Sequence, residues 1–266
     1  MDHLLRSIAP ISDAGWELLD REARERLTPA LAARRLVDFS GPHGWRHSST
    51  NIGRVDAIRS SPLPGVTASR RRVLPLVELR AEFELSRAEL RDVDRGADDA
   101  DLGNLDRAAR EIATAENTAV FHGWEKAIRG ISEASPHEEM SLGASAEDYP
   151  RAIAGAVERL LSSGISGPYG LALGPEQYRR AIETAEHGGY PLLEHLRKIV
   201  DGPIVWSPGL TGAIVISMRG GDFQFDCGQD LAIGYLSTDE DQVRLYLEES
   251  FSFHVATDEA AVALKP

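Results

Sequence analysis

Apolar residues recur at three- and four-residue steps in several segments of the chain, the spacing that places them on one face of a helix. The clearest segment is 12–36, where Ser12 or Asp13 can cap the helix. Its apolar stripe comprises Trp16, Leu19, Ala23, Leu27 and Leu31. The same spacing predicts long helices over 104–124 and 146–163 and shorter helices over 175–186 and 191–200.

Toward the C-terminus the pattern changes to the period of two that is typical of strands. Short strands are predicted over 170–173, 213–218, 222–227 and 231–236, with glycine-bearing turns between the last three. From Val243 to Val255 alternate residues are apolar, and Glu249 is the single break in that alternation. Helices and strands that occupy separate parts of the chain predict an α+β fold rather than a regularly alternating one.

Residues 51–79 are extended in pattern and poor in core residues, with a turn at "SSPLPG" (60–65). This segment predicts a hairpin arm, which as an isolated two-stranded ribbon would be marginally stable and is expected to lie on another surface. The arm is basic, and the following stretch, 82–101, is acidic. The arm arginines are Arg54, Arg59, Arg70, Arg71 and Arg72. Two interpretations are open: the arm covers an acidic neighbouring subunit, or both runs are solvated.

Composition narrows the function classes. The 266 residues carry a net charge of −13, which argues against a general nucleic-acid binder, and six acidic residues balance six arginines in the first 35. The single cysteine, Cys227, excludes an intrachain disulfide. No Cys/His spacing resembles a zinc site, so neither a metal nor a cofactor is expected. Without a signal-like start or a long apolar run, we expect a cytoplasmic protein with no membrane partner.

The candidate catalytic residues lack the sequence spacing of a known catalytic or metal-binding motif. Asp222, Asp226, Cys227 and Asp230 stand close together in "RGGDFQFDCGQD" (219–230), which could indicate a metal site or a nucleophile. No histidine pairs with Cys227 at a recognisable spacing, so turns that flank a strand are the favoured interpretation. Neither a Ser-His-Asp set nor an H-E-x-x-H motif is evident. We therefore expect a protein that is not an enzyme.

Seven segments, taken together and in order, resemble the encapsulin family, also called the linocin or bacteriocin family. They are "RSIAPIS" (6–12), "ARRLVDFSGPHGW" (33–45, with Ala33 in place of the usual glycine), "LPLVELRAEFELSRAELRDVDRG" (74–96), "GPYGLAL" (167–173), "HGGYPLLEHL" (187–196), "RGGDFQFDCGQDLAIGY" (219–235) and "VRLYLEESFSF" (243–253). The resemblance implies the Hong Kong 97-type fold of tailed-phage major capsid proteins. It divides the chain into 1–45 (N-terminal helix and start of the peripheral domain), 46–74 (extended loop), 75–138 (peripheral domain with a long spine helix), 139–225 (axial domain) and 226–266 (C-terminal strands of the peripheral domain).

The resemblance implies a shell subunit that assembles with itself into an icosahedral cage of about 60 copies or a multiple. Such cages enclose a cargo enzyme, a dye-decolorising peroxidase or a ferritin-like iron oxidase, through a peptide at the C-terminus of the cargo. Roles in oxidative stress and iron storage follow from such cargo. The family's cargo groove maps onto Leu27, Leu31, Arg34, Asp38, Leu231, Ile233 and Tyr235. Ordinary core packing of the leucines and an Arg34–Asp38 ion pair are the alternatives.

The family's five-fold pore loop maps onto Glu186, His187, Gly188, Gly189 and Tyr190. A ring of His187 would change charge near neutral pH and could gate ions, and a surface loop without such a role is the alternative. Two other functions stay open at this point. One is a phage-type capsid that packages nucleic acid, and the other is a bacteriocin or peptidase activity.

Overall fold

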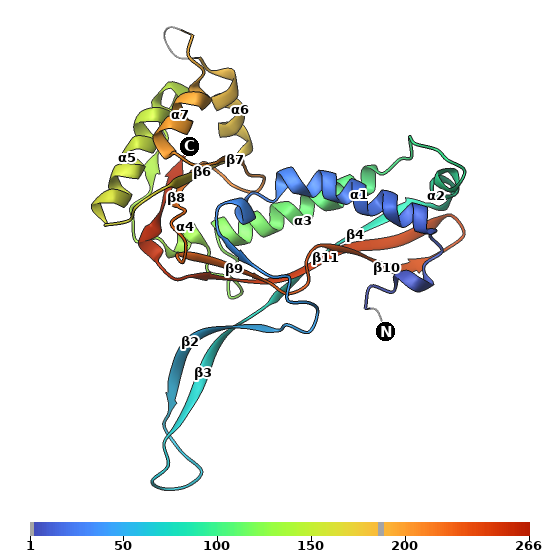
Figure 1. Ribbon diagram of the computed structural model, residues 1–266, viewed down its shortest axis with the longest axis horizontal. Helices are drawn as coiled ribbons and strands as arrows, with labels where there is room; N and C mark the ends of the chain where they lie inside the picture. The colour runs from blue at the N-terminus through green and yellow to red at the C-terminus, as the bar shows by residue number, and fades with distance from the viewer. Residues whose placement is uncertain (1–2, 186–188) are drawn as a thin grey trace.

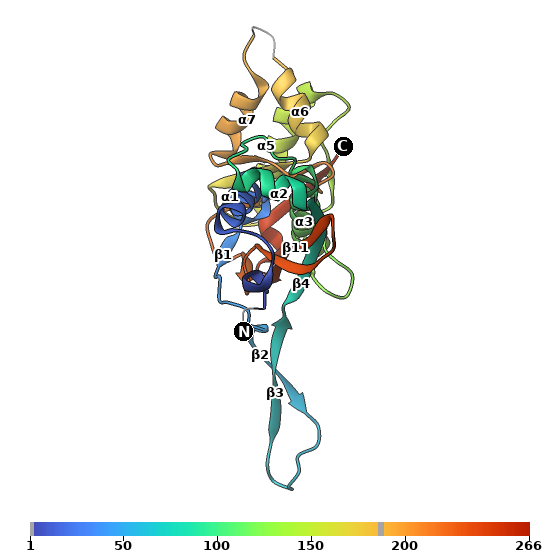
Figure 2. The same cartoon turned by 90° about the vertical axis from the view of Figure 1, so that its right-hand side faces the viewer.

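Two β-sheets, a set of helices and a projecting two-stranded arm make up the computed structural model, which describes residues 3–185 and 189–266 (Figure 1). Seen from the side, the body is narrow and the arm extends well beyond it (Figure 2). The α-helices are α1 Asp13–Ala30, α2 Arg87–Asp94, α3 Gly103–Phe121, α4 Ile131–Ala134, α5 Tyr149–Ser162, α6 Pro175–Glu183 and α7 Leu192–Val200. Short 3-10 helices are η1 Arg6–Ile8, η2 Ala33–Arg35, η3 Ala146–Asp148 and η4 Asp258–Ala260. Within the described ranges, none of the helices is long and apolar enough to cross a membrane.

The first sheet is built on the long strand β11 (Gln242–Val255), which pairs antiparallel with all ten residues of β4 (Val77–Ser86). Along its other edge, β10 (Ala232–Thr238) pairs with the first half of β11 and β9 (Phe223–Cys227) pairs with the second half. The short strand β1 (Asp38–Ser40) runs parallel to β9. Val243, Leu245 and Leu247, which share one face in the predicted pattern, are buried in the core, but from Leu245 to Phe253 the residues of both faces are buried.

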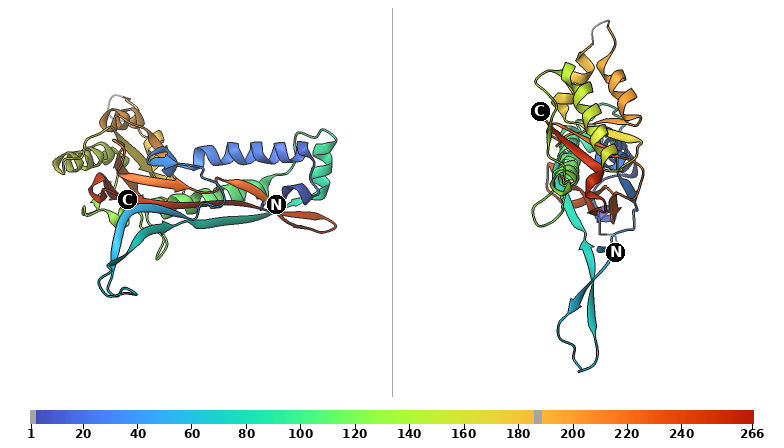
Figure 3. Two further views of the ribbon diagram at one scale, coloured as in Figure 1. Left: turned by 60° about the horizontal axis from the view of Figure 1, so that its bottom comes forward. Right: turned by 90° about the vertical axis from the view of Figure 1, so that its left-hand side faces the viewer.

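Helices α1 and α3 lie along this sheet and close its core (Figure 3). The side chain of Ser12 accepts a hydrogen bond from Gly15 N at 3.0 Å, which caps α1 as predicted. The helix ends at Ala30, short of the predicted position 36. There the buried side chain of Asn117 forms hydrogen bonds with the backbone before and after the end of the helix. Its Nδ2 donates to Ala30 O at 2.8 Å, and its Oδ1 accepts from Ala33 N at 3.0 Å.

The second sheet has the strand order β5–β12–β8–β6–β7. Its strands are β5 Met140–Ser141, β12 Ala261–Lys265, β8 Ala213–Ser217, β6 Tyr169–Leu173 and β7 Ile204–Trp206. Helices α5, α6 and α7 pack beside it at one end of the molecule (Figure 1). The last strand, β12, pairs with β8, so the C-terminal residues return to this sheet instead of staying with β9, β10 and β11, with which the sequence grouped them.

The arm consists of β2 (Ser49–Ile58) and β3 (Ala68–Pro75), which pair only with each other among the described strands. The ladder shifts register between Asn51 and Val55, next to Gly53 at φ +68°. Five large apolar side chains along the hairpin are exposed, namely Val55, Ile58, Leu63, Val66 and Val73. The arm therefore has no core of its own within one subunit, as the sequence predicted.

Candidate functional site

A groove of about 380 Å³ lies between α1, β10 and the segment that precedes α1. Its floor is apolar: Leu27 and Ile233 are buried there, and Leu31 and Leu231 are half-buried. Its polar lining consists of Arg6, Asp20, Arg24, Thr28, Arg34 and Asp230. An apolar floor with a few fixed polar groups suits an extended peptide, which needs burial for affinity and polar contacts for orientation.

Strand β10 presents backbone groups as well as side chains to this groove. The amide of Tyr235 points away from β11 and donates to Leu4 O at 2.8 Å. Because amides alternate in direction along an antiparallel strand, the amide of Ile233 points to the same side. The part of β10 around Ile233 can therefore accept a further extended strand beside it.

Arg34 forms one wall of the groove and is held by three carboxylates, one on α3, one on β11 and one in the connection between β9 and β10. Its Nε donates to Glu116 Oε2 on α3 at 2.6 Å, and its two terminal nitrogens donate to Asp230 at 2.7 Å and to Glu249 on β11 at 2.6 Å. The side chains of Glu116 and Glu249 are fully buried, whereas that of Asp230 is 45% exposed. The cluster thus joins η2, α3 and β11 directly beneath the groove.

Three carboxylates around one guanidinium leave excess negative charge in a buried place. Burial raises the pKa of Glu249 well above its ordinary value, and the charge of Glu116 raises it further, against the attraction of Arg34. Burial also raises the pKa of Glu116, while Arg34 opposes that rise. Among the residues that the structure describes, Glu116 Oε1 and Glu249 Oε1 each lack a donor. Both the burial and the excess negative charge favour the protonated form of Glu249.

The structure brings five of the seven sequence-derived groove residues around this groove: Leu27, Leu31, Arg34, Leu231 and Ile233. Asp38 is not among the lining residues. It lies on β1, where its Oδ2 accepts from Gly221 N at 2.6 Å, so Arg34 pairs with Asp230 and not with Asp38. Tyr235 is half-buried and packs against the core of the first sheet.

The other expected site residues are placed only in part. Glu186, His187 and Gly188 lie outside the described residues. Gly189 and Tyr190 are exposed, and Lys198 Nζ stands 5.0 Å from the centre of the Tyr190 ring. All five arm arginines are exposed. Arg72 bonds Asp56 within the arm at 2.7 Å, so part of the arm's positive charge is matched locally.

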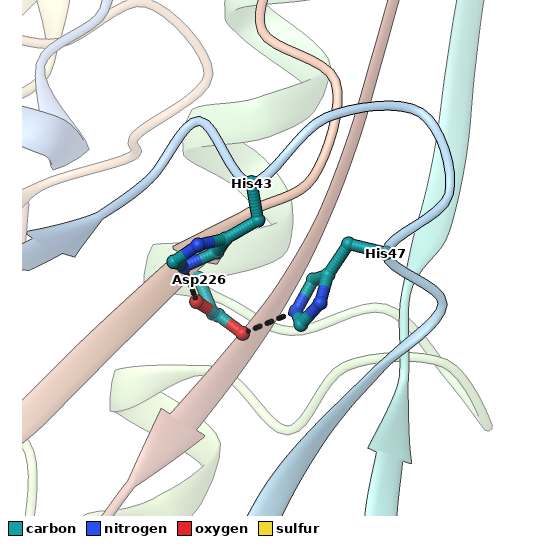
Figure 4. A group of neighbouring side chains, drawn as sticks. All are labelled: His43, His47 and Asp226. Carbon is teal, nitrogen blue, oxygen red and sulfur yellow. Dashed lines mark hydrogen bonds and ion pairs between the residues drawn. The ribbon is translucent and has the colours of Figure 1, made fainter.

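The acidic cluster around Cys227 separates into unrelated contacts. Asp222 forms a two-pronged ion pair with Arg219, at 2.9 Å for each bond, and Asp230 holds Arg34. Burial raises the pKa of the Cys227 thiol to about 12, which leaves it protonated and unreactive. Asp226 bonds His43 and His47, two residues that sequence reasoning did not select (Figure 4). The His-x-x-x-His spacing was the available signal, but the third residue lies about 180 positions away.

Comparisons with known proteins agree on one group. Residues 1–252 match the linocin family, described as encapsulating protein for peroxidase. The chain is 46% identical to the type 1 encapsulin shell protein of Rhodospirillum rubrum, over 100% of this chain and 97% of that protein. It is 42% identical to that of Rhodococcus erythropolis, over 99% and 100%.

Solved structures share the fold at lower identity. The virus-like particle from Pyrococcus furiosus aligns with a TM-score of 0.67 at 20% identity, over 94% of this chain and 99% of that one. The capsid of the Myoviridae phage XM1 aligns with a TM-score of 0.50 at 13% identity, over 86% and 88%. The fold is therefore the Hong Kong 97-type capsid fold that the sequence indicated.

Proposed function

This chain belongs to the linocin family of encapsulin shell proteins, and on that premise we propose that its groove between α1 and β10 receives a peptide of an enclosed cargo enzyme. The chain is a structural subunit that forms a cage, and it is not an enzyme. A peroxidase is the favoured cargo, because the family is described by that cargo. A ferritin-like iron oxidase is the second cargo class. The observation that carries the proposal is the groove itself, with an apolar floor beside an edge strand.

The groove chemistry defines the peptide that would fit. Leu27, Leu31, Leu231 and Ile233 would take apolar side chains, and the outward amide of Ile233 would bond an extended backbone. Arg6 is bonded to Asp20 at 2.7 Å and Arg34 is held by its three carboxylates, whereas Arg24 is exposed at the rim. Arg24 forms no ion pair with any other described residue, so we assign it an acidic side chain or the terminal carboxylate of the cargo.

We propose the same domain division for this chain as the family resemblance implies, with two changes: the whole of β9 (Phe223–Cys227) belongs to the first sheet, and β12 belongs to the second. The arm is the extended loop, and it would lie on a neighbouring subunit, where its five exposed apolar side chains would be buried. The second sheet with α5, α6 and α7 is the axial domain, and β12 joins it. Closed icosahedral symmetry then requires about 60 copies or a multiple. The loop 186–190 would line the five-fold pore.

The loading test replaces Leu31 and Leu231 by aspartate. Leu27 is only 6% exposed, so its replacement would open the core, whereas the two half-buried leucines line the groove from opposite sides. Shells are co-expressed with the cargo enzyme from the same organism and purified by size. We expect hollow particles of normal size with little cargo by mass spectrometry. The matched control is Leu161→Asp, at a 58% exposed leucine on α5.

Normal cargo content in the double variant, alongside a normal control, would remove the groove from the proposal. The two other functions considered from the sequence lack support. The identity to shell proteins is 42–46% over the full chain, against 13% for the phage capsid.

A further inference from the structure

The loop between β1 and β2 carries two histidines that converge on one carboxylate at the root of the arm (Figure 4). His43 Nε2 lies 2.8 Å from one oxygen of Asp226, and His47 Nε2 lies 2.9 Å from the other. Asp226 stands on β9, in the first sheet, so the three side chains join the arm's root to the body. Their ligand atoms all lie within 4.8 Å of one another.

The backbone holds this loop in place. His43 N donates to Cys227 O at 2.9 Å, and Gly44 N donates to Gly228 O at 2.8 Å. At Gly41, φ is +121° and an added Cβ would stand 2.4 Å from Cys227 O, so the loop approaches β9 as closely as only glycine permits. The two imidazoles are therefore positioned before any ligand arrives.

The carboxylate of Asp226 is nearly buried, and the imidazoles open to solvent. Thr50 Oγ1 also donates a hydrogen bond to Asp226 Oδ2, so a third side chain holds the carboxylate in place. The side chain of Asp226 is 12% exposed, while those of His43 and His47 are 41% and 28% exposed. An ion from solution can thus reach two nitrogens and a fixed negative charge.

We propose that His43, His47 and Asp226 bind a divalent transition-metal ion of the zinc class. Two imidazole nitrogens and one carboxylate oxygen, with water in a fourth position, form a donor set that Zn²⁺ uses. Tetrahedral Zn²⁺ with bonds of about 2.0–2.1 Å separates neighbouring ligand atoms by about 3.4 Å. The separations here, from 2.8 Å to at most 4.8 Å, bracket that value, so small side-chain rotations suffice.

The bound ion would link the 41–48 loop to β9 and so tie the root of the arm to the first sheet. This role is separate from the groove between α1 and β10, since none of the three residues lines that groove. Loss of cargo loading and loss of metal binding would therefore be independent results.

The test uses assembled shells that have been stripped with EDTA and dialysed. Titration with ZnCl₂ by calorimetry should give one ion per subunit, and Co²⁺ should give the visible absorption of a tetrahedral site with nitrogen and oxygen ligands. His43→Ala and His47→Ala should each weaken Zn²⁺ binding by about 100-fold or more, beyond the loss of an outer hydrogen bond. His137→Ala is the matched control, because the side chain of His137 bonds the Glu259 carbonyl, at 2.9 Å, and lies outside the cluster.

Equal Zn²⁺ binding in wild-type shells and in both histidine variants would overturn the proposal, as would the absence of one-to-one binding in the wild type. Where an alanine variant fails to assemble, Asp226→Asn keeps the shape of the side chain and removes its charge, and it should also lose the ion. The wild-type Co²⁺ spectrum requires no variant, and an octahedral, water-like spectrum would refute the site by itself.

Discussion

Replacing Arg34 by methionine tests the buried cluster beneath the groove. Methionine keeps much of the length of the arginine stem but removes three hydrogen bonds, at 2.6, 2.7 and 2.6 Å. Glu116 and Glu249 then remain fully buried without a cation, whereas the half-exposed Asp230 turns to water.

The expected loss of folding stability comes mainly from the two buried carboxylates. Removing one partner of a buried ion pair costs about 3–5 kcal/mol, because the remaining charge stays desolvated. The contact with Asp230 adds at most about 1 kcal/mol, since that side chain is largely solvated. The total loss is therefore about 3–6 kcal/mol, and at about 2–4 °C per kcal/mol for a chain of this size the melting temperature should fall by roughly 6–24 °C.

The stability that Arg34→Met loses relative to the wild type should grow as the pH rises. The pKa of Glu249 is raised in the folded state, so its contribution to stability is fully present below the unfolded-state pKa and is lost as pH rises through the folded-state pKa. Without Arg34 the pKa values of Glu116 and Glu249 rise further, and both must be neutral for the fold to persist. The free energy of unfolding of the variant should therefore approach that of the wild type at acidic pH and fall away from it toward pH 8.

The assay is denaturant unfolding of shells at equal subunit concentration, from pH 5 to 8, because assembly contributes to the measured stability. Adding Glu116→Gln and Glu249→Gln to the variant should restore at least half of the loss, since no charge remains buried. Arg35→Met, at the adjacent exposed arginine, should change stability by less than about 0.5 kcal/mol. An Arg34→Met shell that matches the wild type across this pH range would refute the reasoning.

Three further predictions concern assembly, loading and reactivity. The triple variant Arg70→Glu, Arg71→Glu and Arg72→Glu should not form cages, but its circular dichroism should stay unchanged because all three arginines are exposed. Intact cages in micrographs would contradict an electrostatic role for the arm. Arg24→Glu should lower cargo content several-fold, and Arg21→Glu, on the same helix outside the groove, should not; equal loading would remove Arg24 from the contact. Cys227, with its pKa at about 12, should resist maleimide at pH 7 in intact shells and react fully in denaturant; rapid labelling of the native shell would contradict its burial.

The sequence pattern predicted those helices and strands well whose position depends on neighbouring residues alone. The apolar stripe and the Ser12 cap located the start of α1, and the exposed hairpin followed from its lack of core residues. The end of α1 depended on Asn117, which is more than 80 residues away and which no local pattern connects to Ala30. The return of β12 to the second sheet likewise depends on long-range pairing with β8.

The site shows the same division between local and distant causes. The break in alternation at Glu249 was visible in the sequence, and a buried ion pair is a physical reason for such a break. Glu116 stands four residues after Ile112 on the apolar stripe of α3, so it was a second polar position in a core pattern. Only the fold brings these two residues to Arg34, and only the fold brings His43 and His47 to Asp226.

The junction between arm and body determines how the subunit responds to tension. Strand β3 ends at Pro75 and β4 begins at Val77, so the arm continues almost directly into a strand that pairs along ten residues with β11. A force on the arm would therefore pass through one short connection into β4 and be shared by the ten residue pairs that join β4 to β11.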